Sequence, residues 1–206
     1  MKTYTQLAEE LLQNAKTYTP ADEIRKAALV ALADYIKDKI KAQKAIRLNF
    51  ICTHNSRRSH LGAVLSQVLA AYFKLENFES FSGGTEATAF NENAVQALRE
   101  LGIEINKIEE GSNPRYEVVT GDLKSVAFSK KFDEAPNPTS EFAAIMVCDS
   151  ADANCPFVPG AEKRISLPFE DPKKSDGTGR EAQVYRERAL EIGTQLAWVF
   201  LNLSVS

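Results

Sequence analysis

A cysteine, an arginine and a serine lie close together in the segment Cys52-Thr-His-Asn-Ser-Arg-Arg-Ser59. The segment follows an apolar run at 46–51 and precedes apolar residues at helical spacing, so it should join a strand to a helix. At such a junction the unpaired N–H groups of the turn and of the first helical turn converge, and the helix dipole adds its positive end. This arrangement binds an oxyanion and favours the nucleophilic thiolate form of a cysteine. Arg58 is spaced to hold two oxygens of a tetrahedral oxyanion, and Ser59 to donate a hydrogen bond to the sulfur of Cys52.

The segment therefore predicts a nucleophile, Cys52, in an anion-binding loop. Asn55 suits a tight loop because its side chain can bond the backbone and because it tolerates left-handed geometry. A less specific interpretation is a small buried residue at a strand end, followed by a basic helix start. We favour the catalytic interpretation because a cysteine, five residues and Arg-Ser at this kind of junction are rare by chance. The residues expected to bind the substrate are Thr53, His54, Asn55, Ser56, Arg57 and Ser59.

Alternating strands and helices must position this loop. Apolar runs predict strands at Ile46–Ile51, Phe78–Ser82, Ala143–Val147 and Lys163–Leu167, and helical periodicity predicts helices at Ser59–Tyr72, Asn91–Leu101 and Gln183–Leu203. This alternation indicates a doubly wound parallel α/β sheet with helices on both faces. A hairpin is expected to interrupt it, formed by Tyr116–Thr120 and Ser125–Ser129 around the turn signal Gly121-Asp122.

The N-terminal region reads as helical, with Pro20 in a first helical turn. Its expected apolar face consists of Ile24, Ala28, Ala31, Leu32, Tyr35, Ile36 and Ile40. We divide the chain into an N-terminal helical extension, 1–44, and a catalytic domain, 45–206, with an insertion at about 107–140. The extension either packs on the domain or forms a homodimer.

Composition narrows the class of protein. The 206 residues carry 25 Lys and Arg against 28 Asp and Glu, a net charge of −3, and 44% are hydrophobic, as in an ordinary globular protein. That mildly acidic balance gives no reason to expect a nucleic-acid partner. The longest apolar run, Leu196–Leu201, is too short to span a membrane, and residues 1–12 lack an apolar signal core. Three cysteines are too few for a secreted disulfide scaffold, so we expect a cytoplasmic protein.

The loop resembles that of the low-molecular-weight protein tyrosine phosphatase superfamily, which includes the thioredoxin-coupled arsenate reductases. The family's loop has the form C-x-G-N-x-x-R-S, matched here by Cys52, Asn55, Arg58 and Ser59, with His54 in place of the glycine. The resemblance covers 46–106 and 141–203 and implies a four-stranded parallel sheet in the order 2-1-3-4. It also implies that the cysteine attacks phosphorus or arsenic while the arginine and backbone amides hold the oxyanion.

A late Asp-Pro pair supplies the general acid in that family. Asp171-Pro172 stands at the corresponding place, after the fourth predicted strand and before the last helix. Proline would fix the turn that presents the carboxyl group, and an acid beside the leaving oxygen eases its departure. Lys173 follows where the phosphatases of this family carry an aromatic residue.

Two further cysteines, Cys148 and Cys155-Pro156, follow the third predicted strand. Because the carboxyl ends of parallel strands share one edge of the sheet, the loop after this strand can approach Cys52. The Cys-x6-Cys-Pro pattern resembles the thiol relay of the thioredoxin-coupled arsenate reductases. That resemblance implies attack by Cys148 on the Cys52 adduct, and then a Cys148–Cys155 disulfide for thioredoxin to reduce.

Other roles for these cysteines stay open. Both could be inert structural thiols, because cysteine is among the most buried residue types. Zinc binding is disfavoured, because zinc sites want four closely spaced ligands and the chain offers three cysteines with His54 and His60. We expect no metal and no cofactor.

These observations lead to three hypotheses for the function. The first is an arsenate reductase that uses Cys52, Arg58, Asp171, Cys148 and Cys155 and is recycled by thioredoxin. The second is a phosphatase acting on phosphotyrosine or a small phosphomonoester, for which Cys52, Arg58 and Asp171 suffice. The third is a non-catalytic oxyanion-binding module.

Overall fold

The computed structural model describes residues 3–154 and 157–204. Its centre is a sheet of four parallel strands in the order β2-β1-β6-β7. The strands are β1 (Ile46–Cys52), β2 (Phe78–Gly84), β6 (Phe142–Met146) and β7 (Ala161–Ser166). They are the first, second, third and fourth strands of this sheet along the chain, so the expected order 2-1-3-4 is confirmed. The inner strands β1 and β6 are buried on both faces, as their apolar sequences require.

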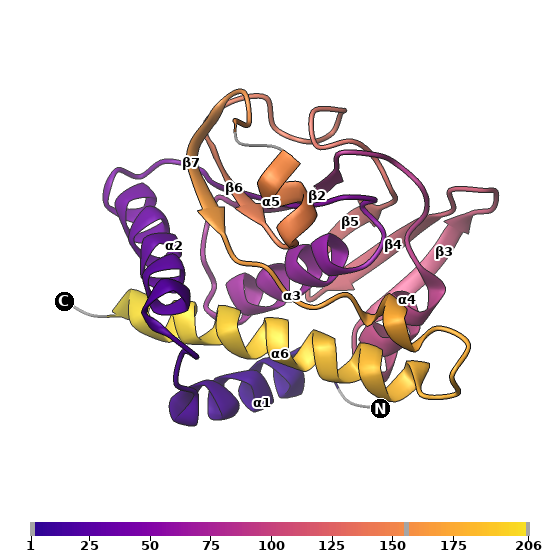
Figure 1. Cartoon of the computed structure of the whole chain (residues 1–206). Coiled ribbons are helices and arrows are strands. Elements are labelled where there is room, and N and C mark those ends of the chain that lie inside the picture. The colour runs from indigo at the N-terminus through magenta and orange to yellow at the C-terminus, as the bar shows by residue number, and fades with distance from the viewer. Residues whose placement is uncertain (1–2, 155–156, 205–206) are drawn as a thin grey trace.

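Helices lie on both faces of this sheet (Figure 1). They are α1 (Tyr4–Thr17), α2 (Glu23–Lys41), α3 (Arg58–Tyr72), α4 (Glu92–Glu100), the short α5 (Asp149–Asn154) and α6 (Glu181–Leu201). Two 3-10 turns, η1 (Pro172–Ser175) and η2 (Asn202–Ser204), flank α6. Helix α6 runs the length of the molecule and packs against α1, α3 and α4 (Figure 1). In the described part of the chain, no helix has the length and apolarity to cross a membrane.

The N-terminal helices share the hydrophobic core of the sheet. Leu7 and Leu11 of α1 are completely buried, and the side chain of Leu11 lies 2.7 Å from where a Cβ on Gly193 would stand. A larger residue at position 193 would therefore force Leu11 to move where α1 crosses α6. Leu29 and Ile36 of α2 also belong to the hydrophobic core.

One expectation for α2 is wrong, and another is confirmed in part. Pro20 lies before the helix, because Asp22 caps it and accepts a hydrogen bond from the N–H of Arg25 at 2.7 Å. The expected apolar face is confirmed at Leu32, Tyr35 and Ile36, which are buried. It is wrong at Ile24 and Ile40, which are 82% and 43% exposed. Leu29, which the expected face left out, is completely buried.

The insertion forms a second, antiparallel sheet of β3 (Glu104–Glu109), β4 (Arg115–Thr120) and β5 (Leu123–Ala127). The expected hairpin is present as β4 and β5. Strand β3 was not predicted, because Ile105 is its one buried residue and the sequence does not alternate. After β5 the chain returns beside β2, where Gly84 donates to the carbonyl of Lys130 at 3.0 Å and accepts from the N–H of Phe132 at 2.9 Å.

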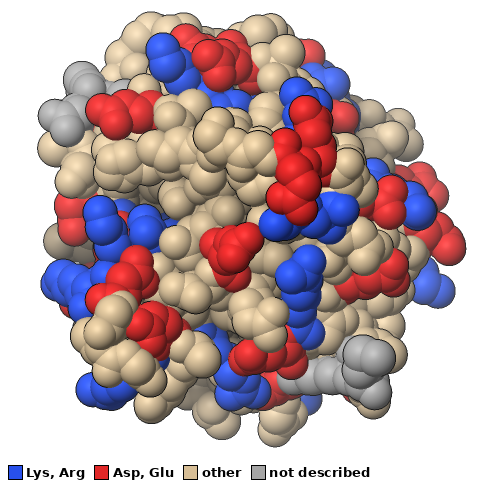
Figure 2. Space-filling view, turned by 90° about the vertical axis from the view of Figure 1, so that its right-hand side faces the viewer, with Lys and Arg blue, Asp and Glu red and all other residues tan. Residues whose placement is uncertain are grey.

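Charged side chains are scattered over the face that includes the insertion. Figure 2 shows acidic and basic groups interspersed there, with no large area of one sign. This distribution agrees with the small net charge of −3.

Candidate active site

Cys52 is the last residue of β1, and its thiol is held by a chain of polar contacts. Its Sγ lies 3.1 Å from Oγ of Ser59. Asn55 has a positive φ of 43° and donates from Nδ2 to the same Ser59 oxygen at 2.9 Å. Oδ1 of Asn55 accepts from the backbone N–H of Lys130 at 2.9 Å, which fixes the orientation of the amide. Because Ser59 accepts from Asn55, its own proton can be donated to the sulfur of Cys52.

The carbonyl groups of the loop are bonded to neighbouring segments. The carbonyl of Cys52 accepts from the N–H of Thr85 at 3.1 Å, and that of Thr53 from the N–H of Glu86 at 2.8 Å. The carbonyl of His54 accepts from the Ser129 hydroxyl at 3.0 Å. These bonds hold the loop in one conformation, as a preorganised anion site requires. They also bring β2 so near that a Cβ on Gly84 would lie 2.6 Å from the nitrogen of Asn55.

Arg58 and Asp171, which the sequence predicts to belong to one site, lie together and form an ion pair. The guanidinium of Arg58 donates to Oδ2 of Asp171 at 2.6 Å and to the carbonyl of Phe169 at 2.8 Å. Its Nε is buried and has no hydrogen-bond partner among the residues described. Oδ1 of Asp171 accepts from the N–H of Lys173 at 3.0 Å and so caps η1, which begins at Pro172. The Asp-Pro turn thus positions the carboxylate against the arginine of the loop.

Arg57 points to α6 and η1. Its Nε donates to the hydroxyl of Tyr185 at 2.8 Å, and its guanidinium lies 3.3 Å from Oδ2 of Asp176. The Tyr185 hydroxyl donates to Oδ1 of Asp176 at 2.8 Å. Burial, more than these neighbours, raises the pKa of Tyr185 to about 12, so its hydroxyl keeps its proton. Arg57 therefore ties the loop to the segment that carries Asp171.

The remaining loop side chains take different positions. His54 is about half exposed and lies 3.7 Å from the carboxylate of Glu86. Ser56 is buried, and its carbonyl accepts from the N–H of Asn91 at 2.9 Å. The hydroxyl of Thr53 lies 3.5 Å from the sulfur of Cys148.

Cys148 lies at the same edge of the sheet as Cys52. The register of β1 and β6 pairs Ile51 with Met146, so both cysteines follow shortly after paired residues. Cys148 is 1% exposed, and its sulfur accepts from the N–H of Ala151 at 3.3 Å. Residues 149–154 form the helix α5, so the prediction of a loop directly after β6 is wrong. The third cysteine of the expected relay, Cys155, lies outside the described residues.

Two residues near the site were not anticipated from the sequence. Ser129 and Lys130 of the insertion bond the carbonyl of His54 and the side chain of Asn55. No local pattern could have signalled these bonds, because they join residues 75 positions apart.

The comparisons with known proteins agree with this geometry. No family model matches the chain. An arsenate reductase of Shouchella clausii is 30% identical over 148 residues, which cover 71% of this chain and 89% of that protein. An arsenate reductase of Bacillus subtilis is 29% identical over 148 residues, which again cover 71% of this chain and 89% of that protein. Among solved structures, a low-molecular-weight phosphotyrosine phosphatase of Vibrio cholerae O395 matches with a TM-score of 0.52 at 15% identity, covering 77% of this chain and 95% of that one. This last likeness concerns the fold alone.

Proposed function

We propose that this chain, which belongs to the arsenate reductase branch of the low-molecular-weight protein tyrosine phosphatase superfamily, reduces arsenate to arsenite with Cys52, Cys148 and Cys155. The observation that carries the proposal is the buried sulfur of Cys148, 3.5 Å from the hydroxyl of the residue that follows Cys52. A phosphatase needs one thiol in this loop, whereas a reductase needs a second within reach.

The first step is attack by the Cys52 thiolate on arsenic. A sulfur–arsenic bond forms and an arsenic–oxygen bond breaks. The departing hydroxyl oxygen takes a proton from Asp171 and leaves as water. Arg58 and the loop N–H groups hold the remaining oxygens, and the buried Nε of Arg58 is a donor free to join them. The hydroxyl of Ser59, 3.1 Å from the sulfur, stabilises its negative charge.

The second step transfers two electrons to arsenic. The Cys148 thiolate attacks the sulfur of Cys52, and a disulfide forms. The sulfur–arsenic bond breaks with its electron pair going to arsenic, which leaves as arsenite. Cys155 then attacks Cys148, Cys52 departs as a thiolate, and a Cys148–Cys155 disulfide remains. Exchange with the dithiol of thioredoxin reduces that disulfide and completes the cycle.

The decisive assay follows NADPH oxidation in a mixture of arsenate, thioredoxin and thioredoxin reductase. The wild-type protein should turn over, whereas Cys148→Ser and Cys155→Ser should lose thioredoxin-linked turnover. Ser150→Ala, which changes an exposed residue of α5, is the matched control and should retain it. Equal turnover in the wild type and in both cysteine variants would refute the relay.

A second candidate function is hydrolysis of a phosphomonoester, favoured by one observation. The carboxylate of Asp171 lies 2.6 Å from the loop arginine, where a general acid for phosphate ester cleavage belongs. This function predicts that aryl phosphate hydrolysis survives loss of Cys148 and Cys155 and collapses in Asp171→Ala. Comparing Asp171→Asn separates the two roles of the residue, because the amide can still accept a bond from Arg58 but has no acidic proton to give.

A further inference from the structure

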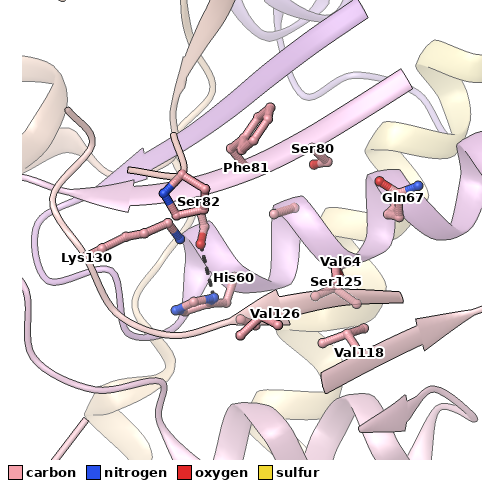
Figure 3. Close-up of a pocket in the computed structure, with 13 residues that line it drawn as sticks. His60, Val64, Gln67, Ser80, Phe81, Ser82, Val118, Ser125, Val126 and Lys130 are labelled. Carbon is pink, nitrogen blue, oxygen red and sulfur yellow. Dashed lines mark hydrogen bonds between the residues drawn. The ribbon is translucent and has the colours of Figure 1, made fainter. Parts of the chain in front are cut away.

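A pocket of about 150 Å³ lies beside the catalytic loop, between α3, β2 and the β4–β5 hairpin (Figure 3). His60, the residue after the loop, forms part of its wall. Figure 3 shows Lys130 reaching toward Ser82 and His60 at one end, with Gln67 at the other. Valine side chains line the space between them, contributed by Val64, Val118 and Val126.

Lys130 is a buried cation without a counterion. It is 4% exposed, and it forms no ion pair with any carboxylate of the described residues. Its Nζ lies 3.4 Å from the carbonyl of Phe128 and 4.9 Å from the centre of that ring. Neither contact supplies a negative charge. Lysine is almost never fully buried unless it is paired, so the position calls for an anion.

The pocket carries one positive charge. Burial and the neighbouring Lys130 hold the pKa of His60 well below its usual range, so the imidazole is neutral. Its Nδ1 lies 3.1 Å from the hydroxyl of Ser82, and its ring stacks on Phe90 at 3.9 Å. A single cation is matched by a single negative charge, which favours a carboxylate over a dianionic phosphate.

The size and the apolar walls of the pocket indicate which group should accompany the negative charge of the ligand. A cavity of about 150 Å³ accepts a molecule about the size of benzene, of about six or seven heavy atoms. Apolar walls favour a short hydrocarbon chain, because burying it removes apolar surface from water. We propose that this pocket binds a small organic monocarboxylate, with its carboxylate on Nζ of Lys130 and its hydrocarbon chain against Val64, Val118 and Val126.

Calorimetric titration of the full chain with isovalerate tests this site. Isovalerate should bind, whereas isovaleramide, which has the same shape without the charge, and inorganic phosphate, which has charge without a chain, should bind much more weakly. Lys130→Met should weaken isovalerate binding by about 10- to 100-fold, the usual effect of removing a hydrogen bond to a charged group. Lys131→Met, at the exposed neighbouring position, is the matched control and should bind as the wild type does.

A second variant keeps the test valid if Lys130→Met fails to fold. Val126 is 46% exposed, so Val126→Asp leaves the core intact and places a negative charge in the wall. It should also abolish isovalerate binding. Equal binding of isovalerate and isovaleramide would overturn the proposal, as would a lack of binding to the wild type across straight and branched carboxylates of three to six carbons.

Discussion

Replacing Lys130 by methionine should stabilise the protein, although it removes a charged residue near the active site. Burial lowers the pKa of Lys130 from 10.5 to about 8, so the ammonium form is disfavoured in the folded state. Methionine has a similar length and no charge, and it fills irregular apolar space well. The substitution therefore removes the electrostatic penalty and keeps most of the packing.

The size of the effect follows from the pKa difference. A change of one pKa unit corresponds to about 1.4 kcal/mol, so a drop from 10.5 to about 8 gives about 3 kcal/mol as an upper estimate at pH 7. The attraction between Nζ and the ring of Phe128 is lost as well and reduces the gain by about 1 kcal/mol. We expect the free energy of unfolding of Lys130→Met to exceed that of the wild type by about 2 kcal/mol.

The pH dependence gives the prediction its specific signature. The pKa of Lys130 is lower in the folded state, so the folded protein gives up this proton first as pH rises. Between about pH 8 and pH 10.5 the unfolded chain binds more protons, and the wild type gains stability as pH rises through this window. The difference in the free energy of unfolding between Lys130→Met and the wild type should therefore fall by about 2 kcal/mol between pH 7 and about pH 10.

Urea unfolding at both pH values measures this difference. Lys131→Met is again the control, because an exposed lysine should change stability by less than about 0.5 kcal/mol. The reasoning is refuted if Lys130→Met is less stable than the wild type at pH 7. It is equally refuted if the two proteins differ by the same amount at both pH values.

Three further predictions concern the supports of the site and the packing of the helices. Asn55→Ala removes the bonds to Ser59 and to the N–H of Lys130, and should lower the free energy of unfolding by about 2 kcal/mol in urea titrations and slow turnover. Gly193→Val places a side chain against Leu11 and should lower the free energy of unfolding by about 1–3 kcal/mol. Gly177→Ala is the comparison: it has open space around it but a positive φ, and should lower the free energy of unfolding by about 1 kcal/mol. Arg57→Met cuts the tie to Tyr185 and should speed tryptic cleavage in the segment after Asp171; cleavage at the wild-type rate would contradict this role.

The sequence was informative where local pattern decides structure. A short, wholly apolar run such as Ala143–Val147 is typical of a buried parallel strand, and the Cys52–Ser59 loop is specified by residue types at fixed spacing. The sequence was less informative about which residues at the ends of a helix are buried, because Ile24 fits the apolar spacing of α2 and is exposed. The direction of Arg57 also could not be predicted, because its partner Tyr185 is 128 residues away. Neighbouring arginines look alike in a motif, and tertiary contacts alone separate their roles.

The catalytic loop is supported by three segments that are distant in sequence. The segment directly after β2 bonds the carbonyls of Cys52 and Thr53, and the segment after β7 bonds Arg58 through Asp171. The third support is the insertion, where the backbone N–H of Lys130 sets the direction of the Asn55 amide. That direction decides which way the Ser59 proton points, and hence whether the sulfur of Cys52 receives a hydrogen bond. The insertion lies outside the motif, yet in the mechanism we propose the nucleophile Cys52 depends on it, because the N–H of Lys130 holds the Asn55 amide that directs the Ser59 proton to the sulfur.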